Sequence, residues 1–160
     1  IDAAEFNNPT SASQFGMQDV SKQYHLGSFH QSQEMFEIPV NKKRYNSLSP
    51  AHQAILKNAA YAANSDNYFK ALVRYSADLA KLMNEHKVNV YQTSDAILAE
   101  QLKGWDKIVS EFSGKDPFFK KIIASQKAYA KRTMKYLLMN QPNYKLAYEN
   151  EFGPIGKVKI

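Results

Sequence analysis

From Ser49 onward, apolar residues recur at spacings of three and four, which is the repeat of an α-helix with one buried face. Ser49 is a typical N-cap, Pro50 suits the first helical position, and no Gly or Pro follows before His86. The pattern predicts one helix from Pro50 to His86, roughly 50 Å long at about 1.5 Å per residue. Because that length exceeds the width of a small domain, we expect this helix to link or brace more than one packing unit. The stripe expected to be buried is Ile55, Ala59, Ala62, Ala63, Phe69, Leu72, Val73, Ser76, Leu79, Ala80 and Met83.

Further elements follow this long helix. A short extended segment is predicted over Val88–Tyr91, and the polar residues after it can cap a helix that ends at Gly114. Asp116 and Pro117 then start another helix, and a last one is predicted to begin at Pro142. Aromatic side chains on these helices are interpreted as helix-packing residues, namely Trp105, Tyr129, Tyr136, Tyr144 and Tyr148.

Residues 1–49 have a different sequence pattern, in which short apolar runs alternate with turn-forming residues. A short helix is predicted over Gln18–Gln23. The run Met35–Val40 is apolar and β-branched, and Asn41 closes it, so it predicts a buried strand of about five or six residues. We therefore divide the chain into a strand and loop segment, 1–49, which contributes to a ligand cleft, and a helical part, 50–160.

Composition supports a folded chain and narrows the chemistry. Hydrophobic residues make up 44% of the 160 residues, which is typical of a chain with a core. There is no cysteine, so disulfides, thiolate nucleophiles and Cys-based zinc sites are excluded. The chain starts at Ile1 without a Met or an apolar signal core, so we expect a mature N-terminus or an internal position.

The net charge of +6 concentrates in two basic segments, Lys42–Arg44 and Lys120–Lys135. Such clusters can form a phosphate-binding footprint. In the second segment the basic residues alternate with apolar ones, as on an amphipathic helix whose charged face meets water. Since charge runs on helices usually face solvent, we interpret the segment as a solvated face, with anion binding as the alternative.

Residue patterns of known catalysts are missing. No two of the four histidines, His25, His30, His52 and His86, lie at the i, i+4 spacing of a helical zinc site. No nucleophile elbow, phosphate loop or dinucleotide fingerprint occurs. Acid-base work by paired carboxylates needs two acids in one cleft, and nothing in the sequence brings Glu5, Glu34 and Glu37 together. We therefore expect that the chain is not an enzyme.

One pattern spans the first part of the chain and continues into the long helix. It comprises IDAAEF, Pro9, Phe15-Gly16, Val20, Tyr24, His30, the apolar run ending in Asn41, Leu48, Gln53 and an alanine-rich helix. With this pattern the chain resembles the second half of the solute-binding proteins of tripartite ATP-independent periplasmic (TRAP) transporters. The sequence IDAAE followed by an aromatic residue, with a histidine about 25 positions later, is the specific part of the resemblance.

The resemblance implies an α/β, helix-rich fold, the C-terminal portion of a two-lobed type II periplasmic binding protein whose long helix spans both lobes. It implies a periplasmic protein that closes on a small organic acid, such as a 2-oxo acid, hydroxy acid or dicarboxylate, and delivers it to a membrane permease. Most of the first lobe, a signal peptide and the arginine that pairs with the substrate carboxylate are then expected upstream of Ile1. The C-terminal helices of some relatives mediate dimers, so a homodimer is a further expectation.

The resemblance also implies ligand contacts, at Glu5, Phe6, His30 and Gln31. In members that bind 2-oxo acids through a metal ion, the residue matching Glu5 supplies a side-chain oxygen and the residue matching Phe6 a backbone carbonyl. Gln31 stands where those members often have Glu, and it reaches the same site. Carboxylate, carbonyl and amide oxygens suit a hard cation such as Na⁺ or Ca²⁺, which then bridges to the anionic ligand.

Phe6 and Gln31 depart from the pattern, because Phe lacks an indole N–H and Gln brings no negative charge. Without the resemblance, Glu5 is interpreted as an exposed acid, Phe6 as a core aromatic and His30 as a histidine bonded to the backbone. Two other functions stay open beside transport. One is a basic helical module that binds nucleic acid or anionic lipid through Lys120–Lys135, and the other is a purely structural or dimerising chain. The transport interpretation involves no nucleic acid.

Overall fold

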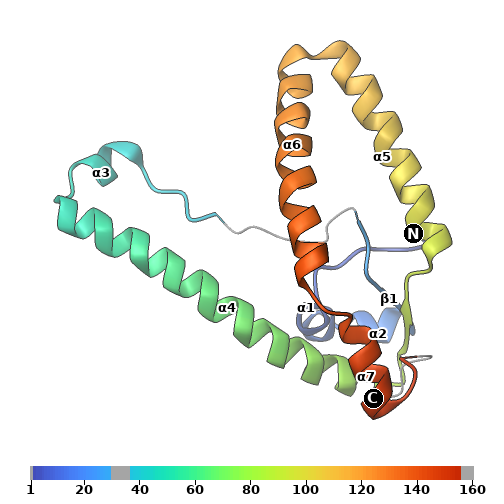
Figure 1. The fold of residues 1–160 in the computed structure, drawn as a ribbon. Coiled ribbons are helices and arrows are strands. Elements are labelled where there is room, and N and C mark those ends of the chain that lie inside the picture. Colours follow the sequence, from blue (N-terminus) through green and yellow to red (C-terminus); the bar gives the residue numbers. More distant parts are fainter. Residues whose placement is uncertain (1, 30–36, 156–160) are drawn as a thin grey trace. The chain divides into compact units, whose positions relative to one another are not determined.

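The computed structural model describes residues 2–29 and 37–155 (Figure 1). These residues form two compact units, one of residues 2–24 and 37–90, the other of residues 25–29 and 91–155. The elements, in chain order, are α1 (Pro9–Gln14), α2 (Met17–Val20), β1 (Gln23–Leu26), α3 (Lys42–Asn46), α4 (Pro50–Asn84), β2 (Asn89–Gln92), α5 (Asp95–Lys115), α6 (Pro117–Asn140) and α7 (Tyr144–Phe152). The fold is therefore helix-rich with a small sheet, as expected; the division at residues 49 and 50 stays a prediction.

The long helices begin where the sequence predicts. The Ser49 hydroxyl accepts a hydrogen bond from the His52 backbone N–H at 3.3 Å, and Pro50 opens α4. The Asp116 carboxylate accepts from the backbone N–H groups of Phe118 and Phe119 at 2.8 and 3.2 Å, and α6 follows. Each cap satisfies N–H groups that have no partner in the first turn of a helix. The predicted long helix is confirmed over Pro50–Asn84, two residues shorter than expected.

The end of α4 turns sharply into β2. Lys87 has φ 56°, the left-handed region that Gly usually occupies. Its ammonium donates to the Asn84 carbonyl at 2.6 Å, and the Val88 N–H donates to the Leu82 carbonyl at 2.9 Å. These bonds close the end of the helix. The predicted extended segment after it is confirmed as β2.

The sheet consists of β1 and β2. The Asn89 N–H donates to the Lys22 carbonyl at 2.7 Å, and the Thr93 N–H to the Leu26 carbonyl at 2.9 Å. Both partners advance by four residues in the same direction, so the two strands are parallel. The short helix predicted over Gln18–Gln23 is partly wrong, because α2 ends at Val20 and Gln23 already belongs to β1.

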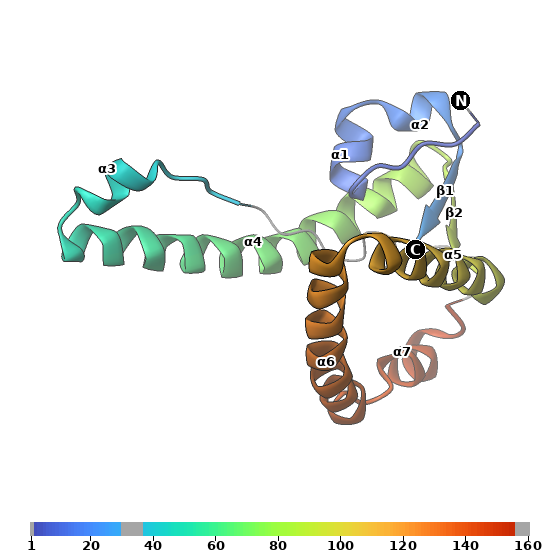
Figure 2. The same ribbon diagram turned by 90° about the horizontal axis from the view of Figure 1, so that it is seen from above.

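In the first unit, α1 packs on the C-terminal part of α4 (Figure 2). Ala12 of α1 and Leu82 of α4 are buried, with exposed fractions of 5% and 2%. The prediction of a buried stripe along all of α4 is wrong for its N-terminal two thirds. Phe69 and Val73, for example, are 66% and 73% exposed. The helical repeat is confirmed, but among the described residues α1 covers only one end of the helix.

The buried strand predicted over Met35–Val40 is also wrong for the residues that the structure describes, 37–40. Met35 and Phe36 lie outside the described residues, and residues 37–40 have no regular structure and are exposed. Ile38, for instance, is 72% exposed. Asn41, predicted to close the strand, instead caps α3 by accepting from the Arg44 N–H at 3.1 Å. A β-branched run forms a strand only beside a partner, and none of the described strands pairs with it.

In the second unit, α5 and α6 pack against each other. Val109 and Ile123 are the buried apolar residues of this pair, and the rings of Phe112 and Phe119 lie 5.8 Å apart. Helix α5 runs one residue past Gly114, and α7 begins two residues after Pro142. The aromatic residues interpreted as packing residues are exposed among the described residues: Trp105 49%, Tyr129 63%, Tyr136 67%, Tyr144 67% and Tyr148 46%.

Many large apolar side chains on the helices are exposed among the described residues, for example Val73 and Leu138 at 73% each. Much of the apolar helix surface therefore has no partner within the described residues. In the part of the chain that the structure describes, no helix is both long and apolar enough to cross a membrane.

Candidate functional site

The segment with the first two predicted contacts, Glu5 and Phe6, leads into α1. Residues 2–6 have no regular structure. Asn8 then caps α1, and its side chain accepts from the Ser11 N–H at 2.8 Å. The ring of Phe6 is half-buried and meets the ring of Phe15 edge-on, with centroids 5.3 Å apart and planes at 61°. An edge-to-face pair fixes the orientation of a ring as well as burying it. Phe6 is therefore held at the end of α1.

Glu5 directly precedes Phe6 in the chain and is exposed to solvent. None of the ion pairs among the described residues includes its carboxylate. Its oxygens are therefore available to a cation or to a donor on a ligand. No group of three or more His, Cys, Asp or Glu side chains in the described ranges can hold a metal ion. The predicted ligand set is of another type, because it combines the Glu5 carboxylate with a backbone carbonyl and an amide oxygen.

Helix α1 is fixed to α4 by a hydrogen bond between two residues 68 positions apart. The hydroxyl of Thr10, which is 8% exposed, donates to the Asp78 carboxylate at 2.6 Å. The guanidinium Nε of Arg74 lies 3.7 Å from the same oxygen. Since Phe15 sits at the end of α1, this bond also sets where the Phe6–Phe15 pair lies on the first unit. Sequence reasoning missed Thr10 and Asp78, because the sequence gives no sign of their pairing.

The other two predicted contacts, His30 and Gln31, lie outside the described residues. The chain just before them belongs to the second unit, where Gly27 has φ 83° and turns the chain out of β1. Gln101 of α5 holds the next residues, because its amide oxygen accepts from the Phe29 N–H at 3.1 Å and from the Ser28 hydroxyl at 3.2 Å. Gln101, which the sequence did not single out, thus holds the chain at Ser28 and Phe29. That Glu5, Phe6 and Gln31 share one pocket stays a prediction.

A family comparison decides what kind of protein carries this arrangement. The family model of the bacterial extracellular solute-binding proteins, family 7, matches residues 1–115, which include Glu5, Phe6, both strands and all of α4. The chain belongs to this family. It is a family of periplasmic solute-binding proteins of TRAP transporters, so the resemblance drawn from the sequence is confirmed. Family 7 proteins serve transport and are not a class of enzymes.

One relative of the chain has a more specific name than the family. The chain is 27% identical over 152 residues to a monocarboxylate 2-oxoacid-binding periplasmic protein of Nostoc sp. (strain PCC 7120 / SAG 25.82 / UTEX 2576). The alignment covers 94% of this chain and 40% of the relative, so the chain spans about two fifths of that protein's length. No solved structure matches the chain significantly.

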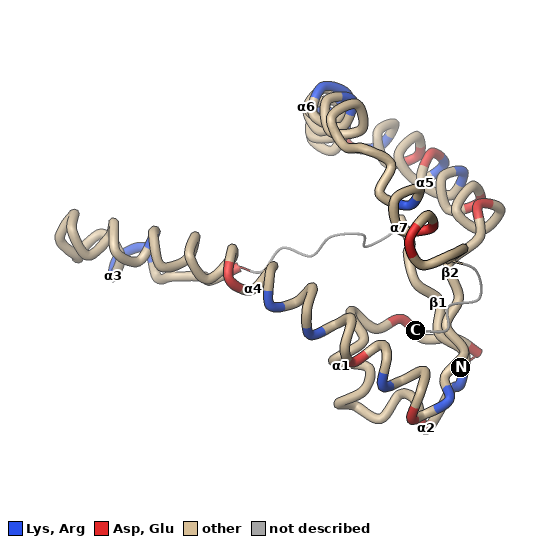
Figure 3. Tube along the Cα trace, turned by 60° about the horizontal axis from the view of Figure 1, so that its bottom comes forward, with Lys and Arg blue, Asp and Glu red and all other residues tan. Residues whose placement is uncertain are grey.

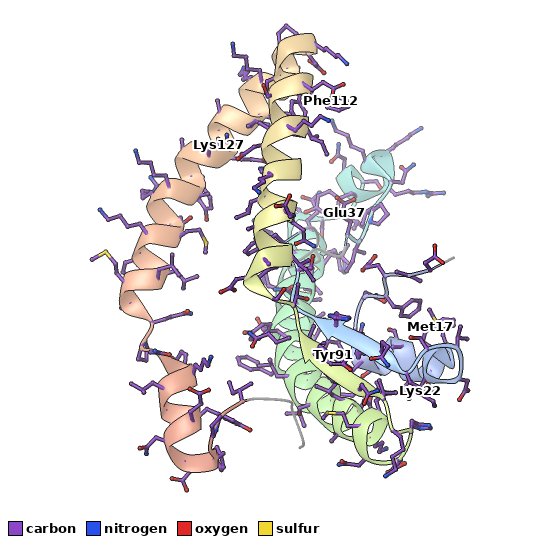
Figure 4. All side chains as sticks on the ribbon, turned by 90° about the vertical axis from the view of Figure 1, so that its right-hand side faces the viewer. Met17, Lys22, Glu37, Tyr91, Phe112 and Lys127 are labelled. Carbon is purple, nitrogen blue, oxygen red and sulfur yellow. The ribbon has the colours of Figure 1, made fainter. Side chains whose placement is uncertain are left out.

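Two further features of this family 7 chain adjoin the candidate residues in sequence. The ring of His25 on β1 stacks on the ring of Tyr91 on β2, with centroids 5.1 Å apart and planes at 24°. Tyr91 is labelled in Figure 4. The neighbouring Tyr24 alternates to the other face of β1 and is half-buried. Burial raises the pKa of the Tyr24 phenol above its ordinary value of 10.0, because the charged phenolate loses hydration there.

A hollow of about 420 Å³ lies beside α3, apart from the Glu5 segment in sequence. Its lining residues are Asn41, Lys43, Arg44 and Ser47. The two cations belong to the first basic cluster noted in the sequence. The Asn41 amide oxygen and the Arg44 carbonyl are already engaged, the former by the Arg44 N–H and the latter by the Ser47 hydroxyl at 2.7 Å. The hollow has no apolar side chain in its lining, unlike most small-molecule sites.

Proposed function

We propose that this chain is part of a periplasmic solute-binding protein that captures a small organic acid and delivers it to the membrane permease of a TRAP transporter. The observation that carries the proposal is the family match over residues 1–115, together with a relative named for binding monocarboxylate 2-oxo acids. The ligand is proposed to be a 2-oxo acid, a hydroxy acid or a dicarboxylate. A signal peptide and the remaining part of the cleft are proposed to belong to the same gene product.

In this proposal Glu5, Phe6, His30 and Gln31 contact the ligand. Two observations support it: Glu5 is exposed, and the ring of the next residue, Phe6, is held by Phe15, as residues that shape a ligand site should be. The half-buried Phe6 ring supplies an apolar wall. Gln101 supports the second part of the site by holding Ser28 and Phe29, the residues that lead to His30.

A Na⁺ or Ca²⁺ ion is proposed to bridge the protein and the ligand carboxylate. The donors would be the Glu5 carboxylate, the Phe6 backbone carbonyl and the Gln31 amide oxygen. Oxygen donors of these types fit a hard cation, and the absence of Cys agrees with a site that does not select soft metals. The ion would supply positive charge against the acid. Glu5 would orient the ion, and Phe6 would exclude water from one side of it.

The test is calorimetric titration of the complete gene product with 2-oxo acids, lactate and C4-dicarboxylates. We expect heat with at least one of these classes, and weaker binding after chelation of divalent ions if Ca²⁺ is the bridge. No heat with any class, in the presence of Na⁺ and Ca²⁺, would contradict the proposal.

Two matched pairs of variants sharpen this test. Glu5→Gln removes a charged donor and should weaken binding on the order of 10- to 100-fold, whereas Asp2→Asn, three residues away, should not change it. Phe6→Leu should weaken binding, whereas Phe15→Leu removes only the ring that supports Phe6 and should have a smaller effect. If the Glu5→Gln and Asp2→Asn variants bind the ligand with equal affinity, Glu5 does not contact the ligand.

Gln31→Glu gives a test with the opposite sign. A carboxylate at this position adds a negative charge to the proposed donor set, so we expect tighter cation binding and stronger dependence of ligand affinity on the cation. Titration of Ca²⁺ against the variant measures this directly. The predicted homodimer stays a prediction, and light scattering of the complete gene product measures it.

A further inference from the structure

The whole charge excess of this chain is located on α6. The chain has 21 basic and 15 acidic residues, and α6 carries six of the basic residues and no acidic one. The rest of the chain is therefore neutral, with 15 charges of each sign. The six are Lys120, Lys121, Lys127, Lys131, Arg132 and Lys135. Figure 3 shows basic residues without acidic ones along this helix.

These six residues, which we call the basic stripe, occupy one face of α6. At 100° per residue they fall within an arc of about 140°. Phe119, whose ring meets Phe112 of α5, lies on the opposite arc. Figure 4 shows side chains with nitrogen tips projecting from the side of α6 away from α5. The basic stripe is thus a continuous face some 22 Å long, which α5 does not cover.

The basic stripe has no internal counter-charge. None of the ion pairs within residues 2–29 and 37–155 involves α6, although α4, α5 and α7 each carry at least one. The Arg132 side chain makes an interaction of another kind, since its guanidinium lies 5.9 Å from the centre of the Tyr129 ring. All six residues are exposed. Six adjacent cations without acids repel one another, and an external anionic surface would relieve that repulsion.

Two apolar side chains extend the same face and indicate which anionic surface fits. Leu138 and Met139 follow Lys135 within the same arc, and they are 73% and 77% exposed. Exposed aliphatic side chains gain no free energy from contact with phosphates or acidic side chains. They gain free energy at the boundary between lipid headgroups and acyl chains, where basic residues nearby pair with the headgroups.

We propose that α6 is a membrane-surface docking element, whose basic stripe binds anionic phospholipid headgroups while Leu138 and Met139 enter the lipid interface. This function is separate from the proposed capture of an organic acid and holds or fails independently of it. It would hold the protein close to the membrane.

The test is co-sedimentation of the chain with phosphatidylcholine vesicles that contain one third phosphatidylglycerol, compared with pure phosphatidylcholine vesicles. We expect binding only to the anionic vesicles, decreasing as salt rises. Neutralising the three charges Lys127→Gln, Lys131→Gln and Arg132→Gln together should weaken binding on the order of 100-fold, at roughly fivefold for each basic residue near such a surface.

A matched control removes the same charge elsewhere, through the triple substitution Lys42→Gln, Lys43→Gln and Arg44→Gln on α3. If the proposal is right, the α3 variant binds within about threefold of the unchanged chain, since long-range attraction alone is screened over about 10 Å. Equal losses in both triple variants would mean that net charge, and not the basic stripe, causes binding, and would overturn the proposal.

The apolar part is tested by Leu138→Ser combined with Met139→Ser, which keeps every charge. We expect binding to anionic vesicles to fall by on the order of tenfold. Unchanged binding would overturn the lipid assignment, as would equally tight binding to duplex DNA at the same salt, because either result describes a general polyanion surface. Circular dichroism verifies that each variant keeps the helix content of the unchanged chain.

Discussion

The hydrogen bond between Thr10 and Asp78 is expected to hold α1 on α4. Thr10 is 8% exposed, and its hydroxyl donates to the Asp78 carboxylate at 2.6 Å. Thr10→Val removes this donor at nearly constant volume. A hydrogen bond to a charged group contributes about 1.5–3 kcal/mol. Because the Asp78 side chain is 20% exposed and Arg74 lies 3.7 Å away, we expect the lower end, about 1.5–2 kcal/mol of lost stability.

The assay is urea unfolding followed by circular dichroism. At a slope of roughly 2 kcal/mol/M, the midpoint should fall by roughly 0.8–1 M. Thr133→Val is the matched control, since its half-buried hydroxyl donates only to the Tyr129 carbonyl of its own helix at 2.9 Å. That carbonyl keeps its helical hydrogen bond, so we expect a change below about 0.5 kcal/mol.

A double-mutant cycle separates this bond from the other effects of each substitution. Asp78→Asn keeps an acceptor oxygen but removes the charge, and on that background Thr10→Val should cost less than it does in the unchanged chain. Hydrogen exchange of the α1 amides should accelerate in Thr10→Val. A loss below about 0.5 kcal/mol, or the same loss with and without Asp78→Asn, would refute the view that this bond fixes α1.

Three further predictions follow from burial, ionisation and backbone conformation. Leu82→Ala should lower the free energy of unfolding by about 2–5 kcal/mol in urea titrations because Leu82 is 2% exposed, whereas Leu138→Ala, at a 73% exposed site, should change it by less than about 0.5 kcal/mol. Burial raises the pKa of Tyr24 in the folded chain above that in the unfolded chain. The contribution of Tyr24 to stability should therefore be constant below pH about 10 and fall above it, so thermal melts should show a smaller loss of stability above pH about 10 in Tyr24→Phe than in the unchanged chain. Gly104→Ala should stabilise the chain by about 0.5–1 kcal/mol, because Gly104 lies within α5 and no atom lies within 4 Å of an added Cβ. Gly153→Ala should destabilise the chain, because Gly153 has φ 82°. The denaturant midpoints of the two variants should therefore move in opposite directions.

The ends of the helices could be predicted from local sequence because capping acts over three or four residues. Ser49 before Pro50 and Asp116 before Pro117 each place a side-chain oxygen where the first free N–H groups of a helix require one. The strand predicted over Met35–Val40 is wrong at residues 37–40 because a strand depends on more than local sequence. Its residues favour a strand, but a strand also needs a neighbour, and no local signal states whether one is present.

Of the candidate site, the sequence supplied the residue types and, through the family pattern, the family itself. It could not supply the supports: the Phe15 ring against Phe6, the Thr10 bond to Asp78 and the Gln101 amide that holds Phe29. These partners are 9, 68 and 72 positions apart, distances at which side-chain chemistry alone cannot select one partner among many.

The sequence by itself thus determined helix content, helix starts, net charge and membership of a solute-binding family, all of which depend on local spacing or on composition. Only the tertiary structure decided which of the predicted apolar faces are covered. Along α4 the repeat is continuous, yet burial is confined to the end where α1 packs. A hydrophobic stripe indicates that a helix face can be buried, but it does not indicate which element covers that face. The same holds for α6. Its sequence gives the positions of the basic residues, and the packing of α5 on the opposite side leaves the basic stripe uncovered.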